Sequence, residues 1–499
     1  MPQQPISNEQ TYQLAPTKKK SWLLTWLVRA FSVLMLLVIL AAIGHGVWGW
    51  HQSKKLQEQL AQYRAAGEPV SVADFVSHPI PDDQNAAVVL RHAAQSIDEK
   101  SEAWQTFQSA EETAAHPLTE NELKEYRQII ATYASALKSP AEAARRPKID
   151  WGIVWTSPVF TSLDLKFLNE QRRLATLLAA DAMVAQHDGD HARALRRVDE
   201  LLLLSRLVDQ QPSLISHLVS IGLSAMASDV AVKTSHGMTL DAADEPDKFA
   251  PLRREQVTAT IAALLDTSSL ETGRRQLWLG ERMMMVDAME CFADGRLSGF
   301  DLDATPTERS KANAVAGYVL RPIALGDARL MAKVMTRARD AAVALDLPTH
   351  RAMLSQDKLD ADPGRGHLFA RILLPSFGRA VEQDYKGLSD RRMAAIALAY
   401  CLYALDHKGE TPASLNDLVP RYLPSVPIDA MTAGQPIGYR RDLETIYSVG
   451  SDGRDDGGYE PPPEATRAQV LQKSDEVRHL KRQPRPVVET PEEEGVPQE

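Results

Sequence analysis

The chain is poor in cysteine and in aromatic residues. Its 499 residues include two cysteines, Cys291 and Cys401, and only 6% of them are Phe, Trp or Tyr. Two cysteines exclude the disulfide framework that holds many small secreted domains together. They leave open a single bridge or, alternatively, two buried thiols on apolar helix faces. Abundant Ala and Leu beside so few aromatics favour helices.

The chain also lacks recognisable catalytic motifs, and it carries no excess of positive charge. The formal net charge is −10, so nucleic acid is not an expected partner. The sequence contains no nucleophile elbow, phosphate-binding loop, HExxH or CxxC motif. This absence favours a noncatalytic protein. An exported hydrolase with its site in the helical region is the alternative.

One long hydrophobic run lies near the N-terminus. Residues 30–50 contain no formal charge over 21 positions. About 20 apolar residues in a helix cross roughly 30 Å of hydrocarbon. Trp22 and Trp26 flank the run on one side, and Trp48 and Trp50 lie at its other end. Indole rings prefer both membrane interfaces, so the pattern predicts a transmembrane helix at 30–50.

The basic residues around this run predict its orientation. Four precede it and three follow it: Lys18, Lys19, Lys20 and Arg29, then Lys54, Lys55 and Arg64. The positive-inside rule therefore places the N-terminus in the cytoplasm. We expect a single-pass membrane protein with its main domain outside the cytoplasm. In a diderm bacterium this is the inner (cytoplasmic) membrane, with the domain in the periplasm. A cleaved signal peptide is the alternative, although the polar lead is long for one.

Composition divides the remaining chain into segments. Residues 1–29 are predicted to be a cytoplasmic tail, and 51–366 an exported helical domain. Residues 367–460 are predicted to be a small α+β module, followed by a Pro-rich, charged and disordered tail at 461–499. The expected fold class is therefore mostly α. It comprises a transmembrane helix, an irregular helical bundle and the small C-terminal module.

Helix-boundary signals lie within the predicted helical domain. Gly189 is expected to end one helix, because glycine suits the left-handed position after a helix, and Asp190 to cap the next. This helix–turn–helix resembles a tetratricopeptide hairpin, but no 34-residue period is present, so an irregular bundle is the alternative. Asp82 or Asp83 is expected to cap a further helix at 86–97.

Three clusters in this domain have chemistry-bearing residues. "HDGDH" at 187–191 resembles a metal-ligand set, although Gly189 favours a capped turn. Glu281 and Arg282 stand in the apolar run "GERMMM", where they either form a site or pair inside the bundle. His217 in "LISHLVSIG" is either a ligand or a hydrogen-bonded core histidine.

The C-terminal part has the most specific pattern. A helix leads into "HKGETPASLNDLV" at 407–419, then a Pro-rich passage, two short strands and the Asp/Gly loop "YSVGSDGRDDGGY" at 447–459. This order resembles the globular part of major pseudopilins of type II secretion. The resemblance implies a small α+β fold and a link to secretion or pilus-like machinery.

Residues 51–459 as a whole resemble membrane-anchored helical proteins of planctomycete and verrucomicrobial type. These proteins share an N-terminal span, an Ala/Leu-rich helical body and a C-terminal module in which Thr411 here replaces an aromatic residue. The resemblance implies an envelope location and no particular activity. We therefore expect a noncatalytic interaction or scaffold protein of the bacterial envelope, with a protein partner there.

The Asp/Gly loop is the candidate metal site. Asp452, Asp455 and Asp456 fall within five residues, and Ca²⁺ prefers six to eight oxygen ligands. The pseudopilin resemblance also implies calcium in a loop near this place. A calcium-stabilised binding module is thus a further alternative function. The simpler interpretation of the loop is a solvated turn that closes the sheet.

Overall fold

The computed structural model describes residues 19–76, 79–113, 116–240, 249–297, 311–354, 366–460 and 475–483. It is mostly helical and has a small antiparallel sheet near the C-terminus, as the sequence predicts. The α-helices are α1 (Lys19–Ala65), α2 (Ala86–Gln95), α3 (Glu102–Thr113), α4 (Glu120–Thr132), α5 (Ser139–Ala143), α6 (Val159–Ser162), α7 (Lys166–Asp188), α8 (His191–Val208), α9 (Leu214–Ser235), α10 (Arg254–Leu265), α11 (Ser268–Ala293), α12 (Lys311–Asp340), α13 (Leu347–Leu354) and α14 (Phe369–Asp406). Short 3₁₀ turns are η1 (Val72–Phe75), η2 (Ala136–Lys138), η3 (Ala341–Val343) and η4 (Leu415–Leu418).

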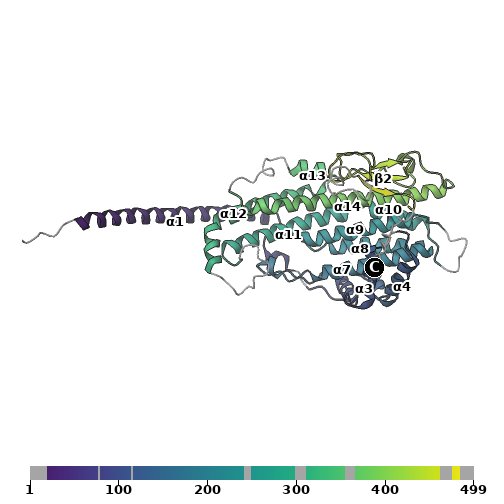
Figure 1. Ribbon diagram of the computed structural model, residues 1–499, viewed down its shortest axis with the longest axis horizontal. Helices are drawn as coiled ribbons and strands as arrows, with labels where there is room; N and C mark the ends of the chain where they lie inside the picture. The colour runs from purple at the N-terminus through teal and green to yellow at the C-terminus, as the bar shows by residue number, and fades with distance from the viewer. Residues whose placement is uncertain are drawn as a thin grey trace, which may run out of the picture.

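Helix α1 projects from one end of the body (Figure 1). Its apolar part up to Ile43 is exposed, and the helix is long and apolar enough to cross a membrane. From His45 onward it packs beside α12, where Leu56 is fully buried. Helix α9 passes the same test of length and hydropathy, but 61% of its apolar window is buried, as expected of a core helix.

The long helices α11, α12 and α14 run along the body beside α7, α8 and α9 (Figure 1). One hydrophobic core joins α7, α8, α9, α10 and the second half of α14, because leucine and alanine recur on facing stripes of these helices. A second core joins the end of α1 to α11 and α12. The predicted boundary between the segments 51–366 and 367–460 stays a prediction.

The predicted turn between α7 and α8 is confirmed. Gly189 has a φ of +82°, and the Asp190 side chain accepts a hydrogen bond from Arg193 N at 3.0 Å. The predicted cap of α2 is wrong. Asn85 caps this helix by accepting from Ala87 N, because it directly precedes the first helical residue, whereas Asp82 and Asp83 lie too early.

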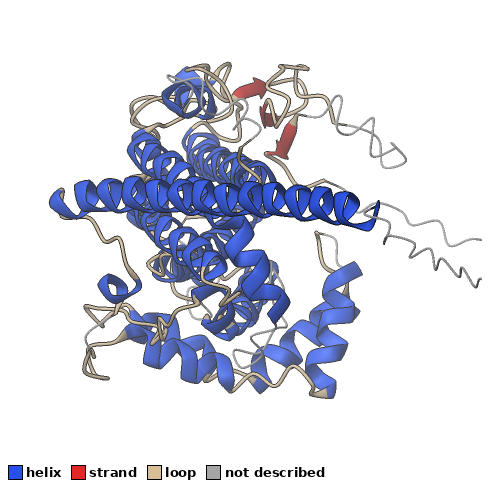
Figure 2. Ribbon diagram, turned by 90° about the vertical axis from the view of Figure 1, so that its left-hand side faces the viewer, coloured by secondary structure: helices blue, strands red, loops and turns tan. Residues whose placement is uncertain are grey.

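A three-stranded antiparallel sheet covers one end of α14, with strand order β1 (Gly438–Arg440), β2 (Thr445–Ser448) and β3 (Glu476–His479). Figure 2 shows the strands together at one edge of the molecule. Ile446 of the central strand is fully buried and belongs to the main core. Strand β3 was not expected, since disorder was predicted at 461–499. That prediction is wrong for 475–483, where β3 pairs with the open edge of β2, and the remainder of the segment lies outside the described residues.

Candidate functional site

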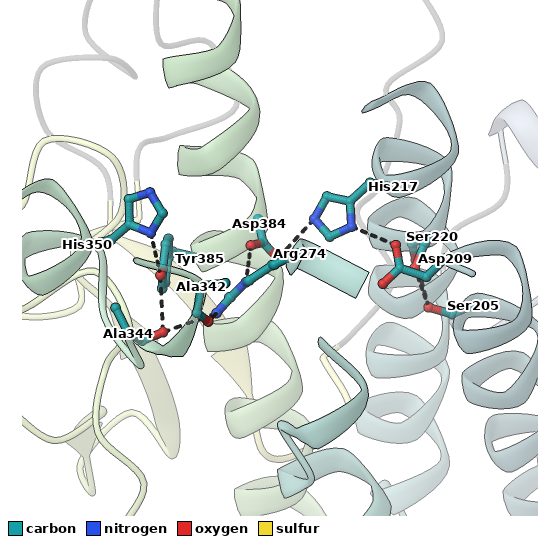
Figure 3. A network of polar contacts seen from close by, with 10 residues as sticks. All are labelled: Ser205, Asp209, His217, Ser220, Arg274, Ala342, Ala344, His350, Asp384 and Tyr385. Atoms are coloured by element: carbon teal, nitrogen blue, oxygen red, sulfur yellow. Dashed lines mark hydrogen bonds and ion pairs between the residues drawn. The ribbon is translucent and has the colours of Figure 1, made fainter. Parts of the chain in front are cut away.

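His217 lies between two aspartates in the centre of the helical body (Figure 3). The histidine is on α9, Asp209 follows the last residue of α8, and Asp384 is on α14. His217 Nδ1 is 2.6 Å from Asp209 Oδ1, and its Nε2 is 3.6 Å from Asp384 Oδ1. Burial lowers the pKa of His217, but the two carboxylates outweigh burial and raise the pKa to about 10. His217 is therefore an imidazolium at neutral pH.

Arg274 of α11 supplies a second positive charge. Its Nε donates to Asp384 Oδ2 at 2.5 Å, and its guanidinium carbon lies 4.5 Å from the centroid of the Tyr385 ring. Arg274 also donates to Ala344 O at 3.1 Å. Burial opposes ionisation of Asp384, but Arg274 and His217 outweigh burial and lower its pKa below the ordinary value. The two negative charges of the aspartates thus balance the two positive charges of His217 and Arg274 inside the network.

Gly273 allows α11 to approach this network closely. A Cβ atom at residue 273 would lie 1.8 Å from Asp209 Oδ2, a distance that no side chain can occupy. A glycine in the middle of a helix lowers helix stability relative to alanine. Here the close approach of the carboxylate gives a physical reason for that glycine.

This charge arrangement has the Asp–His pair of a hydrolase but not its nucleophile. Within the described part of the chain, no serine hydroxyl bonds to His217; Ser205 Oγ donates instead to Ser220 O at 2.9 Å (Figure 3). His217 is 2% exposed, and a general base must reach the proton that it removes. The network is therefore suited to fixing α8, α9, α11 and α14 against one another.

The network continues through Tyr385 to His350 of α13. Tyr385 donates its hydroxyl proton to Ala344 O, and His350 Nδ1 lies 3.1 Å from the same hydroxyl oxygen. We infer that Nδ1 carries the proton and donates it to Tyr385. Burial, together with the charge of Arg274, lowers the pKa of His350 to about 4, so this ring is neutral at pH 7. His350 also forms part of the wall of an apolar cavity of about 180 Å³, with Trp278, Met335, Leu374 and Phe377.

A larger cavity of about 360 Å³ lies beside α2 and the start of α7. Arg91, Asp164, Lys166 and Glu170 are among its lining residues. Lys166 Nζ lies 3.5 Å from Asp164 Oδ2, and the backbone N–H of Lys166 lowers the pKa of Asp164. A lowered pKa keeps this carboxylate ionised, whereas a general acid at neutral pH needs a raised one.

The three predicted calcium ligands lie in the loop that follows β2. Asp452 Oδ1 and Asp455 Oδ1 each accept from the backbone N–H two residues later, at 3.0 and 2.9 Å. Asp456 Oδ2 is buried without a hydrogen-bond partner. Asp475, just before β3, accepts from Gly458 N at 2.7 Å and so closes the loop. Among the described residues, no three His, Cys, Asp or Glu side chains are placed so that they could hold a metal ion together, and calcium stays a prediction.

The residues of "HDGDH" do not form one cluster. His187 is at the end of α7 and His191 is the first residue of α8, on opposite sides of the turn. Asp188 pairs with Arg127 at 2.6 Å, while Asp190 caps α8. The capped-turn interpretation accounts for these acidic groups.

Glu281 and Arg282 of α11 both form hydrogen bonds inside the body, but only Arg282 is paired with an opposite charge. Glu281 accepts from Leu214 N at 2.7 Å, at the start of α9, and burial raises its pKa to about 7. Arg282 is 1% exposed and donates to Glu68 Oε2 at 2.5 Å and to Pro69 O at 2.9 Å. These residues join helices rather than line a site.

Both cysteines are free, so the single bridge is not formed. Burial raises the pKa of Cys291 to about 11 and that of Cys401 to about 12, which keeps both thiols protonated and poorly reactive at neutral pH. The interpretation as thiols packed among helices is therefore the better one.

No protein-family model, no curated protein and no solved structure matches this chain.

Proposed function

We propose that this chain is a membrane-anchored, noncatalytic scaffold of the bacterial cell envelope. Its N-terminus would lie in the cytoplasm and its helical body outside the inner membrane. The observation that carries the proposal is the contrast within α1: almost all of the predicted span at 30–50 is exposed, while the continuation of the helix is packed into the body. An exposed apolar helix of this length has a lower free energy in lipid than in water.

The attachment of α1 to the body supports a scaffold role. Arg282 of α11 donates to Glu68 and to Pro69 O, shortly after the end of α1. Its guanidinium carbon lies 4.3 Å from the centroid of the Tyr63 ring, inside the last turns of the helix. Arg339 of α12 pairs with the same Glu68. Because two arginines fix the end of α1, the angle between the span and the body would be fixed as well, which a scaffold that positions a partner requires.

The C-terminal module offers a surface for the proposed envelope partner. Leu443, in the turn between β1 and β2, is 53% exposed, and Tyr459, beyond the Asp/Gly loop, is 45% exposed. Exposed apolar and aromatic side chains are common anchors of protein interfaces. The pseudopilin resemblance of this module is what suggests secretion or pilus-like machinery as the setting.

Membrane fractionation with a topology reporter tests this proposal. The full chain, expressed in a diderm bacterium with a C-terminal alkaline phosphatase, is expected to resist carbonate extraction and to give active enzyme. The matched variant Leu36→Arg with Leu37→Arg is expected to leave the membrane fraction, because each central arginine costs about 2.5 to 3.5 kcal/mol on insertion. Extraction of the wild-type chain by carbonate would refute the anchor, and an inactive reporter would refute the orientation.

Calcium binding in the Asp/Gly loop is a second candidate, supported by the unpartnered oxygen of Asp456. Ion binding to the folded loop would raise the unfolding temperature by an amount that grows with the logarithm of the ligand concentration over Kd. We expect a higher midpoint with calcium than with chelator, and no such difference in the double variant Asp455→Ala with Asp456→Ala. Equal midpoints for the wild-type protein would leave the loop as a turn.

A further inference from the structure

The beginning of α12 has an apolar face that no described element covers. Val315 is 64% exposed, Tyr318 57% and Val319 55%. Positions i, i+3 and i+4 of a helix lie on one face, so these three side chains form a continuous stripe. The exposed side chains of Leu368 and Ile372, at the start of α14, add to the apolar surface at this end of the body.

This apolar face lies beside the point where α1 leaves the body. His45 Nε2 donates to Val319 O at 2.9 Å, and the His45 ring lies 5.1 Å from the Tyr318 ring. One helical turn further, Gly49 of α1 faces Pro322, whose Cγ would lie 3.7 Å from an added Cβ. Figure 1 shows the start of α12 at the end of the body from which α1 emerges.

The start of α14 lies further from the span, about 12 Å along α12 from Val319. Asp327 of α12 accepts from Phe369 N at 2.7 Å, and His367 Nδ1 lies 2.6 Å from its other carboxylate oxygen. Gly326, one residue earlier, faces Gln52 of α1 at 3.8 Å from its would-be Cβ. The first residues of α14 therefore also lie close to the base of α1.

The rise of α1 places this surface relative to a bilayer. An α-helix rises about 1.5 Å per residue, so His45 lies about 8 Å before Trp50, the end of the predicted span at 30–50, and Gln52 lies about 3 Å beyond it. The stripe on α12 is therefore level with the end of the acyl chains, and the start of α14, beside Gln52, is level with the boundary between acyl chains and headgroups. Tyrosine and tryptophan are enriched there, which fits Tyr318 and the exposed Trp48 and Trp50 of α1.

We propose that the first turns of α12 and α14 are seated in the outer surface of the membrane, with Val315, Tyr318, Val319, Leu368 and Ile372 in contact with phospholipid. The occupant is lipid rather than protein because the surface is continuous with the helix that enters the bilayer. The proposal rests on α1 being a membrane anchor. It makes the body a domain docked on the membrane at a fixed orientation, instead of one that moves freely on a tether.

Spin-label accessibility in phospholipid nanodiscs tests this docking on the full chain. Single cysteines are introduced as Val315→Cys and Ile372→Cys in a background with Cys291→Ser and Cys401→Ser. Both introduced positions are exposed, so the labels disturb no packing. The matched control is Val343→Cys in η3, also an exposed apolar position, and the reference for the span is Leu36→Cys in α1.

For each label, the measured quantity is the ratio of its collision rate with molecular oxygen to its collision rate with a water-soluble nickel chelate. This ratio is expected to be severalfold higher for the labels at 315 and 372 than for the label at 343. If either label is as accessible to the chelate as the control while the label at 36 stays in lipid, the docking is refuted and the anchor stands. If the label at 36 itself contacts the chelate, the anchor fails and the docking fails with it.

Discussion

Replacement of Asp384 by asparagine is the sharpest test of the buried charge network. The change Asp384→Asn keeps the size of the side chain and removes its negative charge. Arg274, 2.5 Å from the carboxylate, and His217, 3.6 Å from it, would then be balanced only by Asp209. The variant would carry one uncompensated positive charge at a place where the side chains are almost fully buried.

The expected loss of stability follows from these distances. Two unit charges about 4 Å apart interact by about 4 kcal/mol at an effective dielectric constant of about 20. Removing one partner of a buried ion pair costs about 3 to 5 kcal/mol, because the remaining charge stays desolvated. We therefore expect Asp384→Asn to lower the free energy of unfolding by about 3 to 5 kcal/mol at pH 7.

Urea unfolding of the full chain in detergent micelles, followed by circular dichroism, measures this loss. The matched control is Asp442→Asn, which removes an exposed partner of Arg440 and should leave the free energy of unfolding almost unchanged, because water screens an exposed ion pair. A difference of less than 1 kcal/mol between the two variants would refute the argument that the network is a desolvated charge cluster.

The pH dependence adds an independent check on His217. Its pKa in the folded protein, about 10, is above the ordinary value of 6.5. Its stabilising contribution is therefore fully present below about pH 6.5 and is lost as the pH rises towards 10. Asp384→Asn removes one of the two carboxylates that raise this pKa. The stability gap between wild type and variant should consequently narrow between pH 7 and pH 10, and a constant gap would contradict a charged His217.

Three further predictions concern residues that join helices. Glu281 has a pKa of about 7 in the folded protein, above its ordinary 4.5, so the free energy of unfolding of the wild type should fall as the pH rises from 4.5 to 7. Urea titrations at several pH values should show that Glu281→Gln lacks this fall. Gly189→Ala should cost about 1 kcal/mol because φ is +82°, whereas Gly222→Ala, inside α9 with open space around it, should not destabilise the protein. Arg282→Gln should cost about 3 kcal/mol and speed limited proteolysis just after α1, because it leaves Glu68 with one arginine fewer; an unchanged cleavage rate would contradict a fixed helix end.

Local signals in the sequence predicted much of the secondary structure. Gly189 and Asp190 specify a turn through backbone conformation and side-chain capping, which act over a few residues and are readable without a fold. The apolar helix at the N-terminus is equally local. Strand β3 was missed because "EVRH" has no strong strand pattern of its own; it is a strand because β2 leaves an edge to pair with.

The charge network could not be predicted in the same way. His217 was noticeable as a polar residue in an apolar helix, but Asp209, Arg274 and Asp384 read as ordinary charged positions in their own segments. Their partners lie on other helices, and only the packing of α8, α9, α11 and α14 brings them together. Gly273 was the available signal, since a glycine inside an apolar helix often marks a close approach.

The position of these charges suggests what they contribute to a scaffold. Helices rich in Ala and Leu present similar surfaces at successive turns, so apolar packing alone discriminates weakly between neighbouring registers. A shift of one turn moves a side chain by about 5.4 Å, which would separate Arg274 from Asp384 and leave both buried and unpaired. We infer that the network fixes the register of the helices in the middle of the body, as Arg282 and Glu68 fix it at the base of α1. In the proposed scaffold, these two fixed places would set the distance and orientation between the membrane and the C-terminal module. This argument requires that Asp384→Asn loosen the body without detaching α1, so the variant should remain in the membrane fraction while its α14 amides exchange hydrogen faster than those of wild type.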